Sequence, residues 1–337
     1  MSRVYYRPIA QSDPCRPANA LPLAGGWTWF DRAERMTRDG ASELVDASDI
    51  PAEIRDRLCA PRAPIARLSF DAPRLMGILN VTPDSFSDGG RFNAPEAALT
   101  QAHEMADAGA DMIDVGGEST RPGAQPVPAE EEIARTAPVI AAIRAGLQTP
   151  ISIDTRKVAV AQAAIGAGGN LVNDVSGFTH DSALAPWCAE AGLPVCVMHA
   201  QGDPQTMQDD PVYDHVTLDV YDFLAARVDA LVAQGIDRSQ IIVDPGIGFG
   251  KTQAHNLTLL SQISLFHSLG CPVLLGASRK KFIGTISGAP DAAARMPGSV
   301  AVALAGIAQG VQIIRAHDVA ATRSAIALWQ AATSGRH

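Results

Sequence analysis

Polar side chains follow eight short apolar runs in this 337-residue chain, each at the point where a run ends. In chain order they are Asn80, Asp114, Asp154, Asn173 with Asp174, His199, Asp244, Ser278 with Lys280, and Arg315 with His317. Asn and Asp often cap the helix that follows a strand, which explains any single position as well as a functional role does. Helix capping is a weak explanation for all eight positions together. The set therefore favours one shared binding site.

These side chains divide into two groups by chemistry. The first offers acceptors and donors suited to the edge of a flat heterocycle, because a carboxylate can accept two parallel N–H bonds. Its members are Asp154, Asn173, Asp244 and Lys280. The second group, Asn80, Arg315 and His317, follows the first and last runs and would bind an anion together with a hard cation. The alternative for Arg315 and His317 is a surface pair that solvates the last loop.

Serine and glycine positions suggest further contacts to a ligand. Ser278 is predicted to open a helix, whose backbone N–H groups would hold a carboxylate or a phosphate. The segment DPGIGFGKT at 244–252 resembles a nucleotide-binding P-loop, but that motif requires glycine where Pro245 stands. Its glycines are expected to let the backbone approach a ligand, with Phe249 as one wall. His199 is interpreted as a wall of the site, because no second His or Cys lies at metal-ligand spacing.

The eight runs alternate with amphipathic stretches, which predicts repeated strand-helix units and a parallel sheet. The runs are 75–80, 111–115, 151–154, 171–174, 195–198, 241–244, 273–275 and 312–315. Helices are predicted at 95–108, 130–145, 157–166, 213–234 and 318–332. Eight such units favour an α/β fold of the closed (β/α)8 TIM-barrel type, with an open doubly wound sheet as the alternative. In such barrels the strand ends carry the chemistry.

Residues 1–73 are predicted to form an N-terminal extension, and residues 74–337 the barrel. The first 74 residues hold 11 Arg, no Lys and 6 of the 17 aromatic side chains, more apolar surface than a disordered tail usually carries. A strand after a turn is expected at 25–30 and a short helix at 51–58. We expect an ordered appendage that packs on the barrel, most simply at its bottom.

The overall composition restricts the class of partner. A net charge of −9, with no long basic run, argues against nucleic acid and against an anionic membrane surface. The five cysteines lack a CxxC pair and are interpreted as reduced, buried thiols. The N-terminus shows no apolar signal region, and the richest apolar stretch, 300–308, is too short to span a bilayer. These features predict a cytoplasmic location.

Seven motifs together make the chain resemble the bacterial dihydropteroate synthase family. They are MGILNVTPDSFSDGG (76–90), DVGGESTRPGA (114–124), SIDT (152–155), NDVSG (173–177), DPGIGFGK (244–251), SRKKFIG (278–284) and RAHDV (315–319). The likeness covers roughly residues 74–332 and leaves the extension unexplained. It implies a transferase of folate biosynthesis. Such an enzyme joins 6-hydroxymethyl-7,8-dihydropterin pyrophosphate to p-aminobenzoate and releases pyrophosphate.

The resemblance also implies a role for each matching residue. The pterin-binding positions are Asp154, Asn173, Met198, Asp244, Gly248, Phe249 and Lys280. The pyrophosphate positions are Asn80, Arg315 and His317, with Mg²⁺ as the cofactor and Asn80 as its ligand. The p-aminobenzoate positions are Phe86, Thr120, Arg121, Pro122, Phe249 and Ser278. The catalytic positions are Asp154, Lys280, Arg315 and His317.

Further expectations concern the mechanism and the assembly. An SN1-like route is implied, in which Asp154 stabilises the cationic ring and two loops, 81–93 and 119–128, cover the site as lids. Sulfonamides are expected to compete with p-aminobenzoate, and a homodimer is expected from the family. Two other readings are a pterin-dependent methyltransferase domain and a non-catalytic pterin-binding protein. The sequences at 278–280 and 315–317 favour the synthase.

Overall fold

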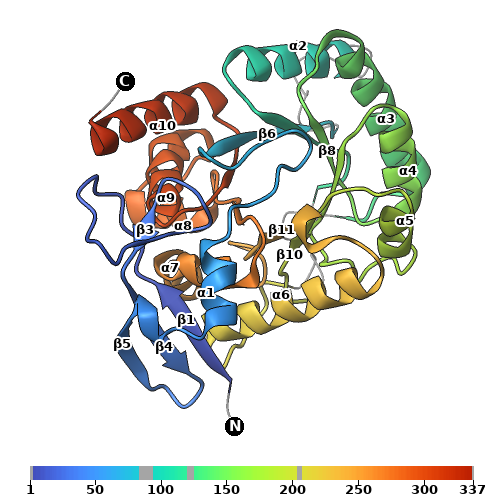
Figure 1. Ribbon diagram of the computed structural model, residues 1–337. Coiled ribbons are helices and arrows are strands. Elements are labelled where there is room, and N and C mark those ends of the chain that lie inside the picture. Colours follow the sequence, from blue (N-terminus) through green and yellow to red (C-terminus); the bar gives the residue numbers. More distant parts are fainter. Residues whose placement is uncertain (1–2, 83–93, 120–124, 203–206, 336–337) are drawn as a thin grey trace.

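Eight parallel strands form a closed barrel at the centre of the molecule (Figure 1). The computed structural model describes residues 3–82, 94–119, 125–202 and 207–335. The strands are β6 (Arg74–Asn80), β7 (Met112–Gly116), β8 (Ile151–Asp154), β9 (Leu171–Asp174), β10 (Val195–Met198), β11 (Ile241–Asp244), β12 (Leu274–Leu275) and β13 (Ile313–Ala316). They are ordered β11-β10-β9-β8-β7-β6-β13-β12. Val243 forms a parallel bridge with Val273, and its N–H donates to Pro272 O at 2.9 Å, so the end strands also meet.

The predicted (β/α)8 fold is therefore confirmed, and each of the eight apolar runs supplies one strand. Every residue of β8, β9, β10 and β11 is buried, which explains why these runs read as continuous apolar segments rather than as alternating patterns. Most of the polar residues named for these runs lie at the carboxyl end of their strand, whereas Asp114 lies in the middle of β7 and Ser278 lies three residues after β12. The eight polar ends consequently meet at one mouth of the barrel.

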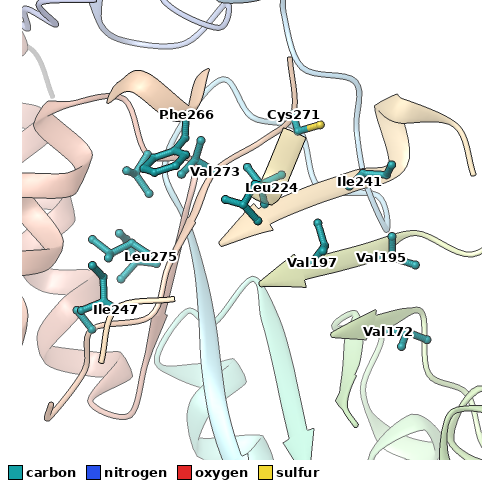
Figure 2. Close-up of a cluster of buried hydrophobic side chains, with 14 of the residues drawn as sticks. Val172, Val195, Val197, Leu224, Ile241, Ile247, Phe266, Cys271, Val273 and Leu275 are labelled. Carbon is teal, nitrogen blue, oxygen red and sulfur yellow. The ribbon is translucent and has the colours of Figure 1, made fainter. Parts of the chain in front are cut away.

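Helices surround the barrel, and all five predicted helices are present (Figure 1). The α-helices are α2 (Ala94–Asp107), α3 (Ala129–Gly146), α4 (Val158–Gly166), α5 (Leu184–Glu190), α6 (Val216–Ala233), α7 (Gln253–Ser261), α8 (Lys281–Ser287), α9 (Met296–Ala308) and α10 (Val319–Ser334). Short 3-10 helices are η3 (Arg238–Gln240), η4 (Ile263–Leu269) and η5 (Ala293–Arg295). The main core fills the layer between strands and helices. Figure 2 shows part of it, where Val197 and Ile241 of neighbouring strands lie near Leu224 of α6.

A second apolar cluster lies inside the barrel, at the end opposite the mouth. It is made of Met76, Met112, Leu171, Cys196, Ile242, Leu274 and Ile313 from the strands, with Ile65 and Phe70 from the segment that precedes β6. Phe70 is 4% exposed and Ile65 is 1% exposed. These two side chains cover the bottom of the barrel.

The extension, residues 3–73, is ordered and has a small core of its own. Its strands β1 (Val4–Pro8), β4 (Arg32–Thr37) and β5 (Ser42–Asp46) pair antiparallel, and β2 (Leu21–Pro22) pairs with β3 (Trp29–Phe30). Helices η1 (Ala47–Asp49) and α1 (Ala52–Cys59) follow. The extension packs on the side of the barrel as well as below it. Trp27 Nε1 donates to Ile307 O of α9 at 2.9 Å, and Ser264 Oγ of η4 donates to Pro8 O at 2.8 Å.

The cysteine prediction is wrong in part. Cys188, Cys196 and Cys271 are buried free thiols, but Cys15 is exposed and Cys59 is only partly buried. Cys15 lies in irregular chain before β2, where no apolar layer covers it. No helix in the described part of the chain combines the length and the apolar character that crossing a bilayer requires.

Candidate active site

Arg315 forms two ion pairs at the barrel mouth. Its Nε donates to Asp114 Oδ2 at 2.6 Å, and its Nη2 donates to Asp154 Oδ2 at 2.8 Å. The three residues come from β13, β7 and β8, so the closed barrel brings together positions that lie far apart in the sequence. Burial alone would lower the pKa of Arg315, but Asp114 and Asp154 raise it above its usual value. Arg315 therefore remains a cation between two carboxylates.

Asp114 also determines the orientation of Asn173. Asn173 Nδ2 donates to Asp114 Oδ2 at 3.2 Å. A carboxylate only accepts hydrogen bonds, so the amide nitrogen must face it and the amide oxygen must point elsewhere. Asn173 thus presents an acceptor to any ligand at the mouth. The sequence pattern marks Asp114 as one of the polar positions that follow the apolar runs, but it predicts no binding role for this residue.

Asp154 is a buried carboxyl with spare hydrogen-bonding capacity. Its Oδ1 has no partner among the described residues, and the same holds for Asp114 Oδ1. Burial raises the pKa of Asp154 to about 7, with Arg315 opposing this shift and Asp114 adding to it. Buried polar atoms are normally hydrogen-bonded, so such an oxygen indicates a position that a ligand fills.

Asp244 lies in a similar environment at the end of β11. Burial raises its pKa to about 6, while the N–H of Gly246, which donates to Asp244 Oδ1 at 2.7 Å, and the charge of Lys280 oppose this shift. Burial thus raises the pKa of both mouth carboxyls above the usual range of an aspartate.

Two glycines keep space open between the charged groups. A Cβ at Gly116 would lie 3.6 Å from Asp154 Cβ and 3.7 Å from Asn80 Oδ1. A Cβ at Gly276 would lie 3.6 Å from Asp244 Oδ2 and 3.9 Å from Arg315 Cβ. Asn80 thus lies next to the Asp154 carboxyl, on the side of the mouth formed by β6.

Lys280 and Phe249 form one wall of the site. Lys280 Nζ lies 3.9 Å from the centroid of the Phe249 ring, a cation–π arrangement. A Cβ at Gly248 would lie 3.0 Å from Lys280 Cδ, so any larger residue there would push the lysine stem. A cavity of about 330 Å³ opens beside Phe249 and is lined further by Met207 and Phe223. Met198, at the end of β10, is buried.

Lys251 supports this wall from below. Its Nζ donates to Gly246 O at 2.9 Å and to Phe249 O at 3.0 Å, and it lies 2.8 Å from His199 Nδ1. Burial lowers the pKa of Lys251 to about 7 and, with the nearby lysine charge, lowers that of His199 well below its usual value. His199 is therefore a neutral ring in the wall of the site. Lys251 belongs to the family motif at 244–251, but the sequence pattern gives no sign that it supports the wall of the site.

Ser278 does not open a helix, and that prediction is wrong. Helix α8 begins at Lys281, and Lys280 is the residue that precedes it. Arg279 has a left-handed φ of 58°, which keeps the chain irregular between Ser278 and the helix. Ser278 Oγ instead accepts the N–H of His317 at 3.2 Å and lies 3.0 Å from His317 Nδ1. Ser278 and His317 thus form one polar pair between β12 and β13.

Several predicted residues lie outside the described part of the chain. They are Phe86, Thr120, Arg121 and Pro122, together with most of the two predicted lids at 81–93 and 119–128. The base of the second loop is described. Glu118 accepts Val127 N–H at 2.9 Å and Arg156 Nη2 at 3.1 Å, and its carboxylate lies 3.2 Å from Lys157 Nζ. Glu118 lies within the motif at 114–124, but no feature of the sequence distinguishes it from its neighbours.

Comparisons with known proteins agree with this geometry. Residues 76–317 match the family described as pterin binding enzyme. The dihydropteroate synthase of Synechocystis is 45% identical over 277 residues, which is 80% of this chain and 96% of that protein. The Xanthomonas albilineans dihydropteroate synthase with 4-aminobenzoic acid is 44% identical, with a TM-score of 0.77, over 81% of this chain and 98% of that one.

A third comparison adds a drug-bound relative. The Yersinia pestis dihydropteroate synthase, solved as a sulfonamide drug complex, is 44% identical with a TM-score of 0.75 and covers 79% of this chain and 96% of its own. The sequence motifs, the closed barrel, the charged mouth and these long matches agree with one another. The chain belongs to the dihydropteroate synthase family of pterin-binding enzymes.

Proposed function

We propose that this protein condenses 6-hydroxymethyl-7,8-dihydropterin pyrophosphate with p-aminobenzoate, forming 7,8-dihydropteroate and pyrophosphate. The observation that carries the proposal is the buried Asp154 carboxyl, with one unpartnered oxygen beside the Arg315 cation. That oxygen suits an N–H donor of a heterocycle, and the cation suits an anionic leaving group. The relatives named dihydropteroate synthase, including one described with 4-aminobenzoic acid, support the same reaction.

In this proposal the pterin lies in the mouth, against Met198, Gly248 and Phe249. Asp154, the Asn173 amide oxygen and Asp244 accept its N–H groups, and Lys280 supplies a donor. The fixed orientation of Asn173 supports this assignment, because the pterin edge that carries the 2-amino group is rich in N–H donors. Raised carboxyl pKa values add support, since a ligand that donates hydrogen bonds would favour the ionised forms.

We assign the leaving pyrophosphate to Asn80, Arg315 and His317. Arg315 uses Nε and Nη2 for the two carboxylates, and its Nη1 has no hydrogen-bond partner among the described residues. This nitrogen is available to a phosphate oxygen. His317 is held by Ser278, which fixes the ring position beside the last strand.

The donor set at this end of the site is compatible with Mg²⁺. Within the described ranges, no group of three or more His, Cys, Asp or Glu side chains forms a metal cage. Mg²⁺ commonly uses only one or two protein oxygens and takes its other ligands from phosphates and water. Asn80 Oδ1 is the protein oxygen that we assign to it. When bound, Mg²⁺ would neutralise charge on the pyrophosphate.

The chemical step breaks the C–O bond between the pterin methylene and the pyrophosphate, and both bonding electrons leave with the oxygen. Arg315 and His317 stabilise the negative charge that grows on that oxygen. The Asp154 carboxylate stabilises the positive charge left on the dihydropterin. A route of this kind needs no strong base. The arylamine nitrogen then attacks the methylene, forms the new C–N bond and loses one proton to solvent. This is the SN1-like route that the resemblance implies.

Recognition of p-aminobenzoate is assigned to Phe249 and Ser278, with Phe86, Thr120, Arg121 and Pro122, which lie outside the described residues. The sulfonamide complex of the Yersinia relative supports competition at the same site. A sulfonamide should raise the apparent KM for p-aminobenzoate without changing kcat. An inhibition constant far weaker than that KM would count against the assignment. The homodimer expected from the family is also part of the proposal, and light scattering tests it.

The reaction is tested by incubating the purified protein with dihydropterin pyrophosphate and Mg²⁺, with and without p-aminobenzoate. Dihydropteroate and pyrophosphate should appear in equal amounts, and only when both substrates are present. Pterin binding without turnover would contradict the synthase and favour the methyltransferase or the non-catalytic reading.

A further inference from the structure

The extension contacts the first turns of α6 through a compact cluster of polar side chains. Arg38 Nη1 donates to Asp219 Oδ1 at 2.7 Å, and its Nη2 donates to Asp222 Oδ2 at 2.6 Å. Asp222 also accepts Tyr5 OH at 2.7 Å and Arg3 Nη1 at 2.8 Å. A guanidinium that bridges two carboxylates defines a geometry better than a single exposed pair does.

An apolar contact anchors the same cluster. Tyr5 is 2% exposed, and its ring lies edge-on to that of Tyr221 at 5.4 Å. Tyr221 in turn stacks on Phe266 of η4 at 6.3 Å. Aromatic pairs of this kind fix relative positions beyond the burial of area. The extension is therefore joined to α6 by packing as well as by charge.

The start of α6 is fixed by one of the residues that bind the extension. Asp219 Oδ2 accepts the backbone N–H of His215 at 3.1 Å, while Asp219 Oδ1 accepts Arg38. His215 is the residue just before the helix, and its ring accepts the N–H of Leu218 at 3.4 Å. One carboxylate thus connects the extension to the end of the loop that precedes α6.

The described residues of this loop, 199–202 and 207–215, contact the glycine-rich loop that follows β11. Tyr213 OH donates to Gly250 O at 2.7 Å, and Gln208 Nε2 donates to Gly248 O at 2.8 Å. At Gly246, where φ is +69°, a Cβ would lie 1.8 Å from His199 O, so the two backbones fit directly against each other. Phe249, the wall residue that contacts Lys280, lies between the two carbonyls that are held.

We propose that the N-terminal extension is a positioning element for the pterin side of the site, acting through α6 on the loop at 245–251. Arg38 and Tyr5 fix the start of α6, and Tyr213 and Gln208 transmit that position to the carbonyls on either side of Phe249. None of these four residues contacts Asp154 or Arg315 in the hydrogen bonds and ion pairs of the described chain, so they position rather than catalyse. The pterin-binding role of the wall formed by Phe249 and Lys280 rests on the proposed function.

A matched pair of substitutions separates positioning from general stabilisation. Arg38→Met removes the bridge to α6. Arg35→Met, in β4, which ends one residue before Arg38, removes a pair with Glu43 inside the extension. Arg38→Met should raise the KM for dihydropterin pyrophosphate by about 3- to 10-fold, with kcat within about 2-fold of the unsubstituted protein. Arg35→Met should leave both unchanged. Equal KM values in the two variants would overturn the proposal.

A double-mutant cycle tests the route of the effect. Tyr213→Phe removes the hydroxyl that holds Gly250 O. If Arg38 acts through Tyr213, adding Arg38→Met to Tyr213→Phe should raise KM much less than Arg38→Met does alone. Effects that simply multiply would show that the two residues act independently and would overturn the proposed route.

Hydrogen exchange of the ligand-free protein keeps this inference separate from the catalytic proposal. Amides at 246–251 should exchange faster in Arg38→Met than in Arg35→Met. If Arg38→Met does not fold, Tyr5→Phe, which removes one hydroxyl, takes its place in both measurements. Faster exchange in Arg38→Met than in Arg35→Met, together with a wild type that makes no dihydropteroate, would defeat the proposed function alone. An active wild type with unchanged exchange and KM in Arg38→Met would defeat the inference alone.

Discussion

The two ends of the barrel differ sharply although the same strands build both. On β7, Met112 belongs to the apolar cluster at the bottom, and Asp114, two residues later, lies among the charges of the mouth. Ile242 and Asp244 on β11, and Ile313 and Arg315 on β13, repeat the change. Residues two apart on a strand point to the same face, so the barrel interior changes from apolar to charged within one layer.

This difference separates stability from function along the barrel axis. The bottom cluster has no charged member and is closed by Ile65 and Phe70, whereas the mouth contains carboxyl oxygens without partners among the described residues. Apolar burial stabilises the fold, and unpaired buried carboxyls oppose it. We therefore expect substitutions at the bottom to change stability, and substitutions at the mouth to change activity.

Phe70→Ala should give the largest change in stability. Removing a buried phenyl ring typically costs about 3–5 kcal/mol of the free energy of unfolding. Because Phe70 lies at the opposite end from Asp154, kcat/KM at a temperature where the variant stays folded should match the unsubstituted protein. Urea unfolding and initial rates measure the two quantities. A variant of normal stability with low activity would contradict the assignment of the barrel bottom to stability alone.

Asp154→Asn should give the reverse result. The amide keeps the shape of the side chain but removes the charge that we assign to stabilising the cationic pterin, so kcat/KM should fall by about 10²- to 10³-fold. The free energy of unfolding should stay close to that of the unsubstituted protein, because burial already disfavours the charged form of this carboxyl. Steady-state kinetics and thermal melts test this. Full activity would contradict the assigned role.

Stability should also depend on pH through the mouth. Burial raises the pKa of Asp154 to about 7 and that of Asp244 to about 6, from an ordinary value of 3.8. The folded state therefore binds these protons more tightly than the unfolded state, and this contribution is lost as pH rises from about 4 through about 7. The loss per group should be about 1 kcal/mol or more. Unfolding of Asp154→Asn between about pH 5 and about pH 8 should show a smaller decline than the unsubstituted protein.

Asp114→Asn should have a smaller effect, on the pH dependence of kcat/KM. The charge of Asp114 contributes to the raised pKa of Asp154, so its removal should lower that pKa. The acid limb of the kcat/KM profile should then move to lower pH by about 1 unit or less. An unmoved limb would mean that Asp154 does not set the pH dependence of the reaction.

The sequence was a good guide wherever a pattern is local. Apolar runs that end on a polar residue marked all eight strands, because strands buried on both faces leave that signature. The prediction that Ser278 opens a helix is wrong because a helix start depends on backbone conformation. The left-handed conformation of Arg279 delays the start of α8 to Lys281, and composition does not reveal this. The exposure of Cys15 likewise depends on tertiary cover.

Residues that act through other residues were the hardest to predict. Asp114 reads as one strand end among eight, and its importance appears only when β13 brings Arg315 beside it. Lys251 has no local partner except carbonyls of its own loop, and its contact with His199 joins two loops. The contact of the extension with α6 joins residues separated by 181 positions. Such long-range pairs leave no periodic signal in one sequence.

Two arginines at opposite ends of the barrel allow the most direct test. Arg315 pairs with Asp114 within β7, on the mouth side of Met112, and Arg323 pairs with Asp111 just before the amino end of the same strand. We predict that dihydropteroate formation by Arg315→Met falls at least about 10²-fold below that of the unsubstituted protein, while Arg323→Met stays within about 2-fold. Equal loss in both variants, or full activity in Arg315→Met, would contradict the division of the barrel into a stabilising end and a chemical end.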